Sequence, residues 1–383
     1  MEGEAEKLYS VLTPIAKCFK KYKDFVSFNS VCTSWRAASS RENFQGLCLV
    51  QETPHLMIST EEEDFDLKFY SLMEEKVVAK VSLPEVKGKK CIESLGWLLV
   101  ISSQTNMSLM NPFTSMKIEL PSQRQFPSHH WVQTNEPYEF IQKMVLSSRP
   151  CQASNFVVMV LYGRSKFLGS WRYNEENWKM IEMSRSKEKN WTITQLRDEI
   201  FHDLTYCNGQ FFAIDSRGSI WACNVTNLNP YQVKLFTYIP YHTNIFQYYI
   251  VESLDKLLVL ACYKGEENWV PWGREYLVES NNQHWGKISY FELFEVDISS
   301  RTWRRINNLG GKALFIGRNS SLLVNASNAL KIKANHIYYA GTSNWLHNGG
   351  AWVYNLEDKN LEPLERGNLI NPMCPPIWIS PFF

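Results

Sequence analysis

The chain repeats a unit of short apolar strands, and this repeat constrains its fold more than any other feature. From residue 46 onward, apolar and polar residues alternate or form short apolar runs, and turn residues recur roughly every 8–12 residues. Two clear units are "CIESLGWLLVISSQTNMSLMNPFTSMKIELP" and "FHDLTYCNGQFFAIDSRGSIWACNVTNLNPYQVKLF", each with four short strands joined by tight turns. Six such units of roughly fifty residues predict a mainly β fold, a six-bladed β-propeller, although a seven-bladed count stays open. The segment "PPIWISP" is predicted to close the ring against the first blade.

Residues 1–45 follow a different, helical pattern and form a separate predicted module ahead of a propeller domain at 46–383. Apolar residues recur at spacings of three and four, Asp24 can cap a helix that starts at Phe25, and Pro14 is expected to interrupt or begin the first helix. Three helices in so few residues cannot bury a core of their own, so a partner is expected to complete the module. Its two apolar faces consist of Val11, Leu12, Ile15 and Phe19, and of Phe25, Phe28, Val31, Cys32 and Trp35.

Composition excludes several classes of protein. The net charge is +1, so no global field favours nucleic acid or an acidic membrane. The nine cysteines include no CxxC pair, which argues against a zinc or redox motif. The acidic start "MEGEAEKLYS" has no apolar signal segment. We therefore expect a reduced protein of the nucleus and/or cytoplasm that is not secreted, with no membrane or nucleic-acid partner.

The order of motifs resembles a known family. The stretch "IAKCFKKYKDFVSFNSVCTSWRAA" resembles the C-terminal two thirds of a plant F-box, and "SLMNPFTSMKIELP", "FELFEVDISSRTWRRINNLGGKALFIG" and "PPIWISP" fit, in order, the kelch-like (KIB-type) β-propeller that follows it in many plant F-box proteins. This resemblance implies a substrate-recognition subunit of an SCF-type E3 ubiquitin ligase. Its F-box would dock on a Skp-type adaptor, and through it a cullin, while the propeller binds a target protein.

The resemblance also implies adaptor-binding residues, and it includes one departure. An F-box usually opens with a Leu-Pro pair and an acidic residue, whereas Lys7, Leu8 and Ser10 stand at those places here. The alternative is that these helical residues pack a linker helix onto the propeller. The expected adaptor-binding residues are Leu12, Ile15, Phe19, Phe25, Phe28, Val31, Cys32 and Trp35.

Four long segments predict the target-binding face. Residues 121–139 and 183–199 link blades, and 264–287 and 341–350 lie within blades. Strand alternation should place all four on one face and leave little but tight turns on the other. Each segment carries tryptophan in polar company, a composition typical of recognition surfaces, although each ring could instead cap its own blade. The tentative target-binding residues are Trp131, Trp191, Trp269, Trp272, Trp285 and Trp345.

No motif points to catalysis. His129 and His130 are adjacent but have no third ligand at a readable spacing, and the pair His202-Asp203 would need a further cleft partner for acid–base work. We therefore predict no enzyme, no cofactor and no metal. The alternative function is a propeller interaction scaffold, or an enzyme, with a vestigial F-box that takes no part in ubiquitination, since propellers host both.

Overall fold

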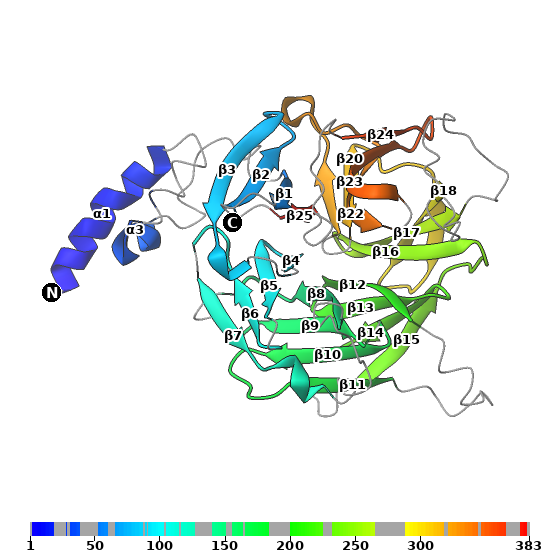
Figure 1. Ribbon diagram of the computed structural model, residues 1–383, viewed down its shortest axis with the longest axis horizontal. Coiled ribbons are helices and arrows are strands. Elements are labelled where there is room, and N and C mark those ends of the chain that lie inside the picture. The colour runs from blue at the N-terminus through cyan, green and yellow to red at the C-terminus, as the bar shows by residue number, and fades with distance from the viewer. Residues whose placement is uncertain are drawn as a thin grey trace.

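The computed structural model shows a ring of β-sheets with a small helical module beside it (Figure 1). The structure describes residues 2–18, 28, 31–38, 53–59, 66–86, 89, 91–102, 105–114, 116–126, 140–150, 155–163, 165–183, 200–224, 232–264, 288–317, 321–343, 346–364 and 376–380. None of the helices in this described part is both long and apolar enough to span a lipid bilayer.

The helical module consists of α1 (Glu2–Cys18) and α3 (Thr33–Ala38), which lie outside the ring, beside β3 (Figure 1). Helix α1 continues through Pro14, so the expectation that this proline interrupts or begins the first helix is wrong. A proline inside a helix removes one backbone donor, and α1 tolerates that loss. Asp24 and Phe25 lie outside the described residues.

The described strands form six blades arranged in a ring, which confirms the six-bladed β-propeller (Figure 1). Within each blade the strands follow one another from the centre of the ring outward. Blade 1 contains, in this order, β25 (Ile377–Ile379), β1 (His55–Ser59), β2 (Asp66–Ser71) and β3 (Lys76–Ser82). Blade 2 contains β4 (Cys91–Ser94), β5 (Trp97–Ile101), β6 (Met107–Met110) and β7 (Lys117–Leu120).

Blades 3 and 4 are joined at their outer edges, because β11 and β15 pair in parallel and so create one eight-stranded sheet. Blade 3 contains β8 (Ile141–Leu146), β9 (Val157–Tyr162), β10 (Phe167–Arg172) and β11 (Lys179–Met183). Blade 4 contains β12 (Phe201–Cys207), β13 (Gln210–Asp215), β14 (Ser219–Cys223) and β15 (Gln232–Tyr238). Blade 5 contains β16 (Ile245–Ser253), β17 (Lys256–Lys264), β18 (Ile288–Asp297) and β19 (Trp303–Ile306).

Blade 6 departs from the expected four strands because its described part has five. The order is β21 (Leu322–Asn325), β20 (Lys312–Gly317), β22 (His336–Ser343), β23 (Leu346–Asn355) and β24 (Leu361–Pro363). The hairpin of β20 and β21 precedes a connection of ten residues, Ala326–Asn335, after which β22 pairs in parallel with β20. A Cβ atom at Gly317 would lie 2.4 Å from the Ala340 carbonyl oxygen, so this parallel pairing requires glycine there.

The ring is closed by β25, as the sequence predicts. Strand β25 pairs antiparallel with β1, and Trp378 lies opposite Leu56. The Trp378 ring is 1% exposed, and its centroid lies 4.9 Å from that of Phe315 in blade 6. One short strand therefore joins the first and last blades.

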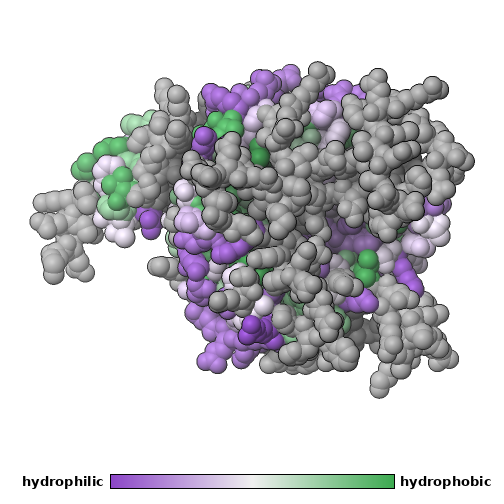
Figure 2. All heavy atoms as spheres, viewed as in Figure 1, coloured by the Kyte–Doolittle hydropathy of each residue, from purple (hydrophilic) through white to green (hydrophobic). Residues whose placement is uncertain are grey.

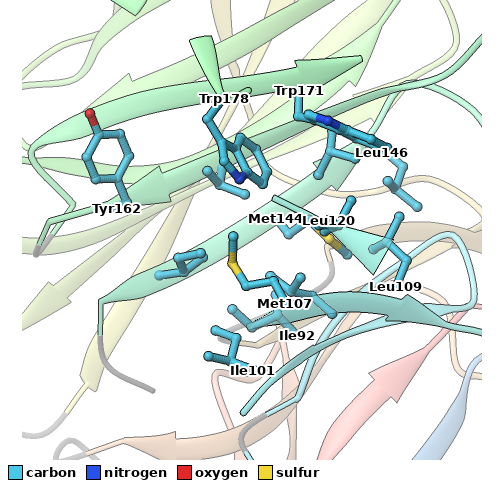
Figure 3. Close-up of a cluster of buried hydrophobic side chains, with 14 of the residues drawn as sticks. Ile92, Ile101, Met107, Leu109, Leu120, Met144, Leu146, Tyr162, Trp171 and Trp178 are labelled. Carbon is cyan, nitrogen blue, oxygen red and sulfur yellow. The ribbon is translucent and has the colours of Figure 1, made fainter. Parts of the chain in front are cut away.

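The core lies between the blades rather than inside any one sheet. Six clusters of buried side chains each join two neighbouring blades, so every sheet buries both of its faces. Figure 3 shows the cluster between blades 2 and 3, where Trp171 and Trp178 pack over Met144 and Leu146. Buried aromatic rings contribute much of the apolar area in such cores.

The innermost strands of all six blades run in the same direction. Contacts between their ends show this in blades 1 to 5, for example Ser380 with Glu93 and Ser94 with Leu146. In blade 6, Lys331 follows β21 and pairs at 2.8 Å with Glu75, which lies in the turn after β2. We call the face where these strands end the carboxyl face, and the face where they begin the amino face.

Candidate functional site

The helical module exposes apolar side chains that nothing in the described chain covers. Val11, Ile15 and Val31 are 59%, 41% and 58% exposed, and we call these three residues the helical patch. Val11 and Ile15 are one helical turn apart, so they share one side of α1. Figure 2 shows hydrophobic residues, coloured green, gathered over the helical module. Such a surface on a small module is typical of a protein-binding site.

The other side of α1 builds a small core within the module. Leu12, Ala16, Phe28 and Ala38 form one buried cluster, and the rings of Phe28 and Trp35 lie 4.3 Å apart. This cluster contains only module residues, so the described contacts do not follow the alternative in which the helices pack onto the propeller. A core this small stabilises the module weakly.

The structure therefore separates the predicted adaptor-binding residues into two groups. Leu12 and Phe28 are buried and Trp35 is half-buried, whereas Ile15, Val31 and Cys32 are exposed. Phe19 and Phe25 lie outside the described residues. Val11 was missing from the predicted set although it is the most exposed of the helical patch. The signal was present, because Val11 and Ile15 have the spacing of one helical face.

A belt of polar side chains lines the central channel of the propeller. The free edge of each innermost strand leaves backbone N–H groups without a strand partner. Side chains of the neighbouring blade accept some of them. The Ser380 N–H donates to Glu93 Oε1 at 3.0 Å, and the Leu146 N–H donates to Ser94 Oγ at 3.0 Å. We call Glu93, Ser94, His202 and Asp203 the polar belt.

His202 and Asp203 have the same structural task in blade 4, facing blade 5. The Tyr248 N–H donates to His202 Nδ1 at 3.1 Å, and the Ile250 N–H donates to Asp203 Oδ2 at 2.9 Å. Burial lowers the pKa of His202 to about 4, so the ring is neutral at pH 7 and accepts this hydrogen bond. Asp203 also pairs with Lys143 of blade 3 at 2.5 Å. The described geometry thus gives this pair a role in joining blades.

The described residues give little support to a metal site or to a reactive cysteine. They contain no group of three or more potential metal ligands, and His129 and His130 lie outside them. Burial raises the pKa of the Cys207 thiol to about 11 and that of Cys223 to about 12, so both remain protonated at pH 7. Thiols of this kind are weak nucleophiles.

The carboxyl face carries two hollows. A cavity of about 380 Å³ lies at the mouth of the central channel. A groove of about 590 Å³ runs along the seam between blades 1 and 6, beside the ion pair of Glu75 and Lys331. The connection Ala326–Asn335 contributes Lys331 and Lys333 to this groove. The expectation that this face has little but tight turns is therefore wrong, because blade 6 has an extra hairpin to connect.

The predicted target-binding tryptophans cannot be placed. Trp131, Trp191, Trp269, Trp272, Trp285 and Trp345 all lie outside the described residues. The strand ends beside their four segments are described, however, and all of them lie at the amino face. Strands β8 and β12 begin there and β17 ends there, because the strands of blades 3 to 5 alternate in direction. Strand β22 ends there because it starts at the carboxyl face, after the connection that carries Lys331.

The fold and its surfaces define a class: a six-bladed β-propeller protein with a helical module that presents apolar side chains. Residues 69–355 match the sequence model of the KIB1-4 beta-propeller family. The chain belongs to this family, and the resemblance to plant F-box proteins with a KIB-type propeller is confirmed.

Curated relatives from Arabidopsis thaliana match over most of their length. The protein At5g55150 is 24% identical, with 98% of this chain and 96% of the relative covered. The F-box protein SKIP23 is 21% identical, with 84% and 80% covered, and the F-box protein At2g26160 is 24% identical, with 85% and 91% covered. Among solved structures, TolB from Acinetobacter baumannii is similar with a TM-score of 0.38 and 11% identity, covering 85% of this chain and 66% of that one. The fold assignment rests on the strand pairing and not on this likeness.

Proposed function

We propose that this protein is the substrate-recognition subunit of an SCF-type E3 ubiquitin ligase. Residues 1–45 would act as the F-box that docks on a Skp-type adaptor, and residues 46–383 as the propeller that holds a target protein. The observation that carries the proposal is the helical patch, an apolar surface on a module whose described core has four buried residues. The names of SKIP23 and At2g26160 as F-box proteins support it. A protein in this role works in the nucleus and/or cytoplasm.

The adaptor interface is proposed to centre on the helical patch. The buried Phe28 and the half-buried Trp35 would then hold α1 and α3 in position, while Ile15 and Val31 make the contact. An adaptor that covers these side chains would remove them from water, which stabilises the complex by about 25 cal/mol for each Å² of apolar surface. Cys32 is exposed next to Val31 and would lie at the same interface.

The test is capture of a purified Skp-type adaptor by the full chain. Ile15→Asp and Val31→Asp each place a charge in the proposed contact, and together they should weaken binding about thirtyfold or more, the effect of losing a hot spot worth about 2 kcal/mol. Val77→Asp is the matched control, since Val77 is 39% exposed on β3 of the propeller. Equal binding by the double variant and the control would contradict the docking proposal.

Target binding is proposed at the amino face. Trp269, Trp272 and Trp285 belong to the longest of the four segments whose flanking strand ends lie at that face, and tryptophans are frequent anchors in interfaces. Alanine at all three positions should abolish target capture while melting temperature and adaptor binding persist. A destabilised triple variant would instead indicate that these rings cap their blade.

The scaffold alternative makes a different prediction in the same assay. The F-box departure at Lys7, Leu8 and Ser10 favours it, because those places lack the usual Leu-Pro pair and acidic residue. If the wild-type chain folds but does not capture the adaptor at all, the propeller would act outside ubiquitination.

A further inference from the structure

The cavity at the mouth of the central channel is built by all six blades. It measures about 380 Å³, within the range of small-molecule sites, and it opens at the carboxyl face. One lining residue from each blade, in order from blade 1 to blade 6, is Ser380, Leu95, Lys143, Tyr206, Glu252 and Ser321.

Asp203 does not line the cavity, but it contacts the lining residues Lys143 and Ser321, and its acceptors are already used. Asp203 is 1% exposed, and each of its carboxylate oxygens has two partners. Oδ1 accepts from the Leu204 N–H at 2.8 Å and contacts Lys143 Nζ at 2.5 Å. Oδ2 accepts from the Ile250 N–H at 2.9 Å and from Ser321 Oγ at 3.3 Å. A ligand with donors would find no open acceptor on Asp203.

The donors at the site, in contrast, are not all used. Lys143 is 4% exposed and lines the cavity, and its ammonium group has three N–H donors, of which the ion pair with Asp203 takes one. Ser380 is 3% exposed and also lines the cavity, and its Oγ has no hydrogen-bond partner in the described part of the chain. Buried donors without partners are unfavourable, so the site favours an occupant that supplies acceptors.

The charges around the cavity decide what kind of acceptor fits. Lys143 is the one cation among the described lining residues and pairs with Asp203, whereas Glu93 and Glu252 are acidic lining residues. The Oε1 atom of Glu93 accepts the N–H groups of Gly96 and Ser380. An anion would be repelled by these acidic side chains, and a cation has no acceptor to offer the N–H and O–H donors of Lys143 and Ser380. A neutral oxygen acceptor avoids both problems, and Leu95 and Leu322 offer apolar surface to the rest of the molecule.

We propose that this cavity binds a small neutral molecule whose carbonyl or hydroxyl oxygen accepts hydrogen bonds from Lys143 and Ser380. The competing possibility is a cavity that holds only water, in which the ion pair serves to join blades 3 and 4. The proposal concerns the propeller alone, so it stands or fails independently of adaptor binding.

The test uses three probes of one shape and different charge: benzamide, benzoate and benzylamine. Saturation-transfer NMR with the full wild-type chain should show binding of benzamide above that of the other two. Lys143→Met should weaken benzamide binding about tenfold or more, since it removes a charged donor. Ser380→Ala should weaken it about fivefold, the effect of one neutral hydrogen bond, and it leaves the ion pair intact if Lys143→Met does not fold.

Lys256→Met is the matched control, because Lys256 forms a 2.8 Å ion pair with Glu295 between β17 and β18 and does not line the cavity. It should bind benzamide like the wild type. Absence of benzamide binding to the wild type would overturn the proposal and leave a water-filled cavity. Stronger binding of benzoate or benzylamine than of benzamide would overturn the claim that the cavity prefers a neutral molecule. Undiminished binding in both cavity variants would place the probe elsewhere and overturn the site.

Discussion

The helical module and the propeller differ in how much of their apolar surface they bury. In the propeller, clusters between all neighbouring blades bury both faces of every sheet, and the polar belt takes up backbone N–H groups along the channel. In the described part of the module, four residues form the buried core, while Val11, Ile15 and Val31 stay exposed. The propeller thus buries its sheets against one another, whereas the module leaves these three apolar side chains in water.

This difference indicates how much a binding partner would add to the stability of the module and of the propeller. Apolar residues that the module leaves in water lower its stability until another surface covers them. The propeller gains less in the same way, because its sheets already bury both faces against neighbouring blades, although single apolar residues such as Leu235 and Leu254 stay exposed. Binding should therefore stabilise the module more than the ring, and damage to the ring should not be repaired by a partner.

The largest expected effect comes from opening the ring. Truncation after Asn371 removes β25 and with it Trp378, whose fully buried ring alone contributes about 3–5 kcal/mol. It also exposes the edge of β1, which then can pair with other chains. We expect loss of the cooperative unfolding transition and aggregation, measured by thermal denaturation and light scattering. A truncated chain that stays monomeric with the same melting temperature would show that β25 does not close the ring.

A smaller loss of stability is expected at low pH, and it should affect the propeller. Burial lowers the pKa of His55 and of His202 to about 4 from the ordinary value of 6.5. In the folded protein both imidazoles stay neutral at pH values at which the unfolded chain already protonates them. The stability that the two neutral imidazoles contribute is fully present above pH 6.5 and is lost as the pH falls toward 4. Residues 1–45 contain no histidine, so this loss concerns the propeller.

Denaturant unfolding at pH 7.5 and pH 5 measures this acid effect. The free energy of unfolding should be lower at pH 5, and His202→Gln should narrow the difference because glutamine can accept the Tyr248 N–H without titrating. The control is His242→Gln, since His242 is exposed and contacts its own turn through the Asn244 N–H. Identical pH dependence in wild type and His202→Gln would disprove the assignment.

The smallest expected effect comes from the exposed side of α1. Val11→Ser and Ile15→Ser remove apolar atoms that already face water, so the free energy of unfolding should change by no more than about 0.5 kcal/mol each. Leu12→Ala is the contrast, because Leu12 is 3% exposed in the module core and its truncation should reduce helix content in far-UV circular dichroism. Equal loss of helix in all three variants would mean that α1 has no distinct exposed side.

The repeat allowed the blades and the closing strand to be predicted, because both depend on local alternation and turn residues. The fifth strand of blade 6 could not be predicted in the same way. The segment "ALFIGRNSSLLVNA" indicates a hairpin, but nothing local determines that β20 rather than β21 faces β22. The strand order depends on the parallel pairing of β20 with β22, which follows the connection Ala326–Asn335 in the chain.

The polar belt escaped prediction for a similar reason. Glu93 and Ser94 stand directly before a turn, and His202 and Asp203 look like a possible acid–base pair rather than acceptors for a neighbouring blade. Their partners are distant in the sequence, such as Ile250 for Asp203. The helical pattern of α1 was correct, but its spacing alone did not say which apolar side turns inward. That depends on where Phe28 and Ala38 are placed by tertiary packing.

The pairing of β25 with β1 also determines when the protein can finish folding during its synthesis. Strand β1 begins at His55, whereas its partner β25 begins only at Ile377. At a translation rate of about 5–20 residues per second, blade 1 must wait about 15–65 s with its inner edge uncovered. Throughout this interval the nascent chain offers an unpaired strand to chaperones or to other nascent chains. A chain that ends before β25 would therefore lack only the inner strand of blade 1, and the uncovered edge of β1 would distinguish it from the folded protein.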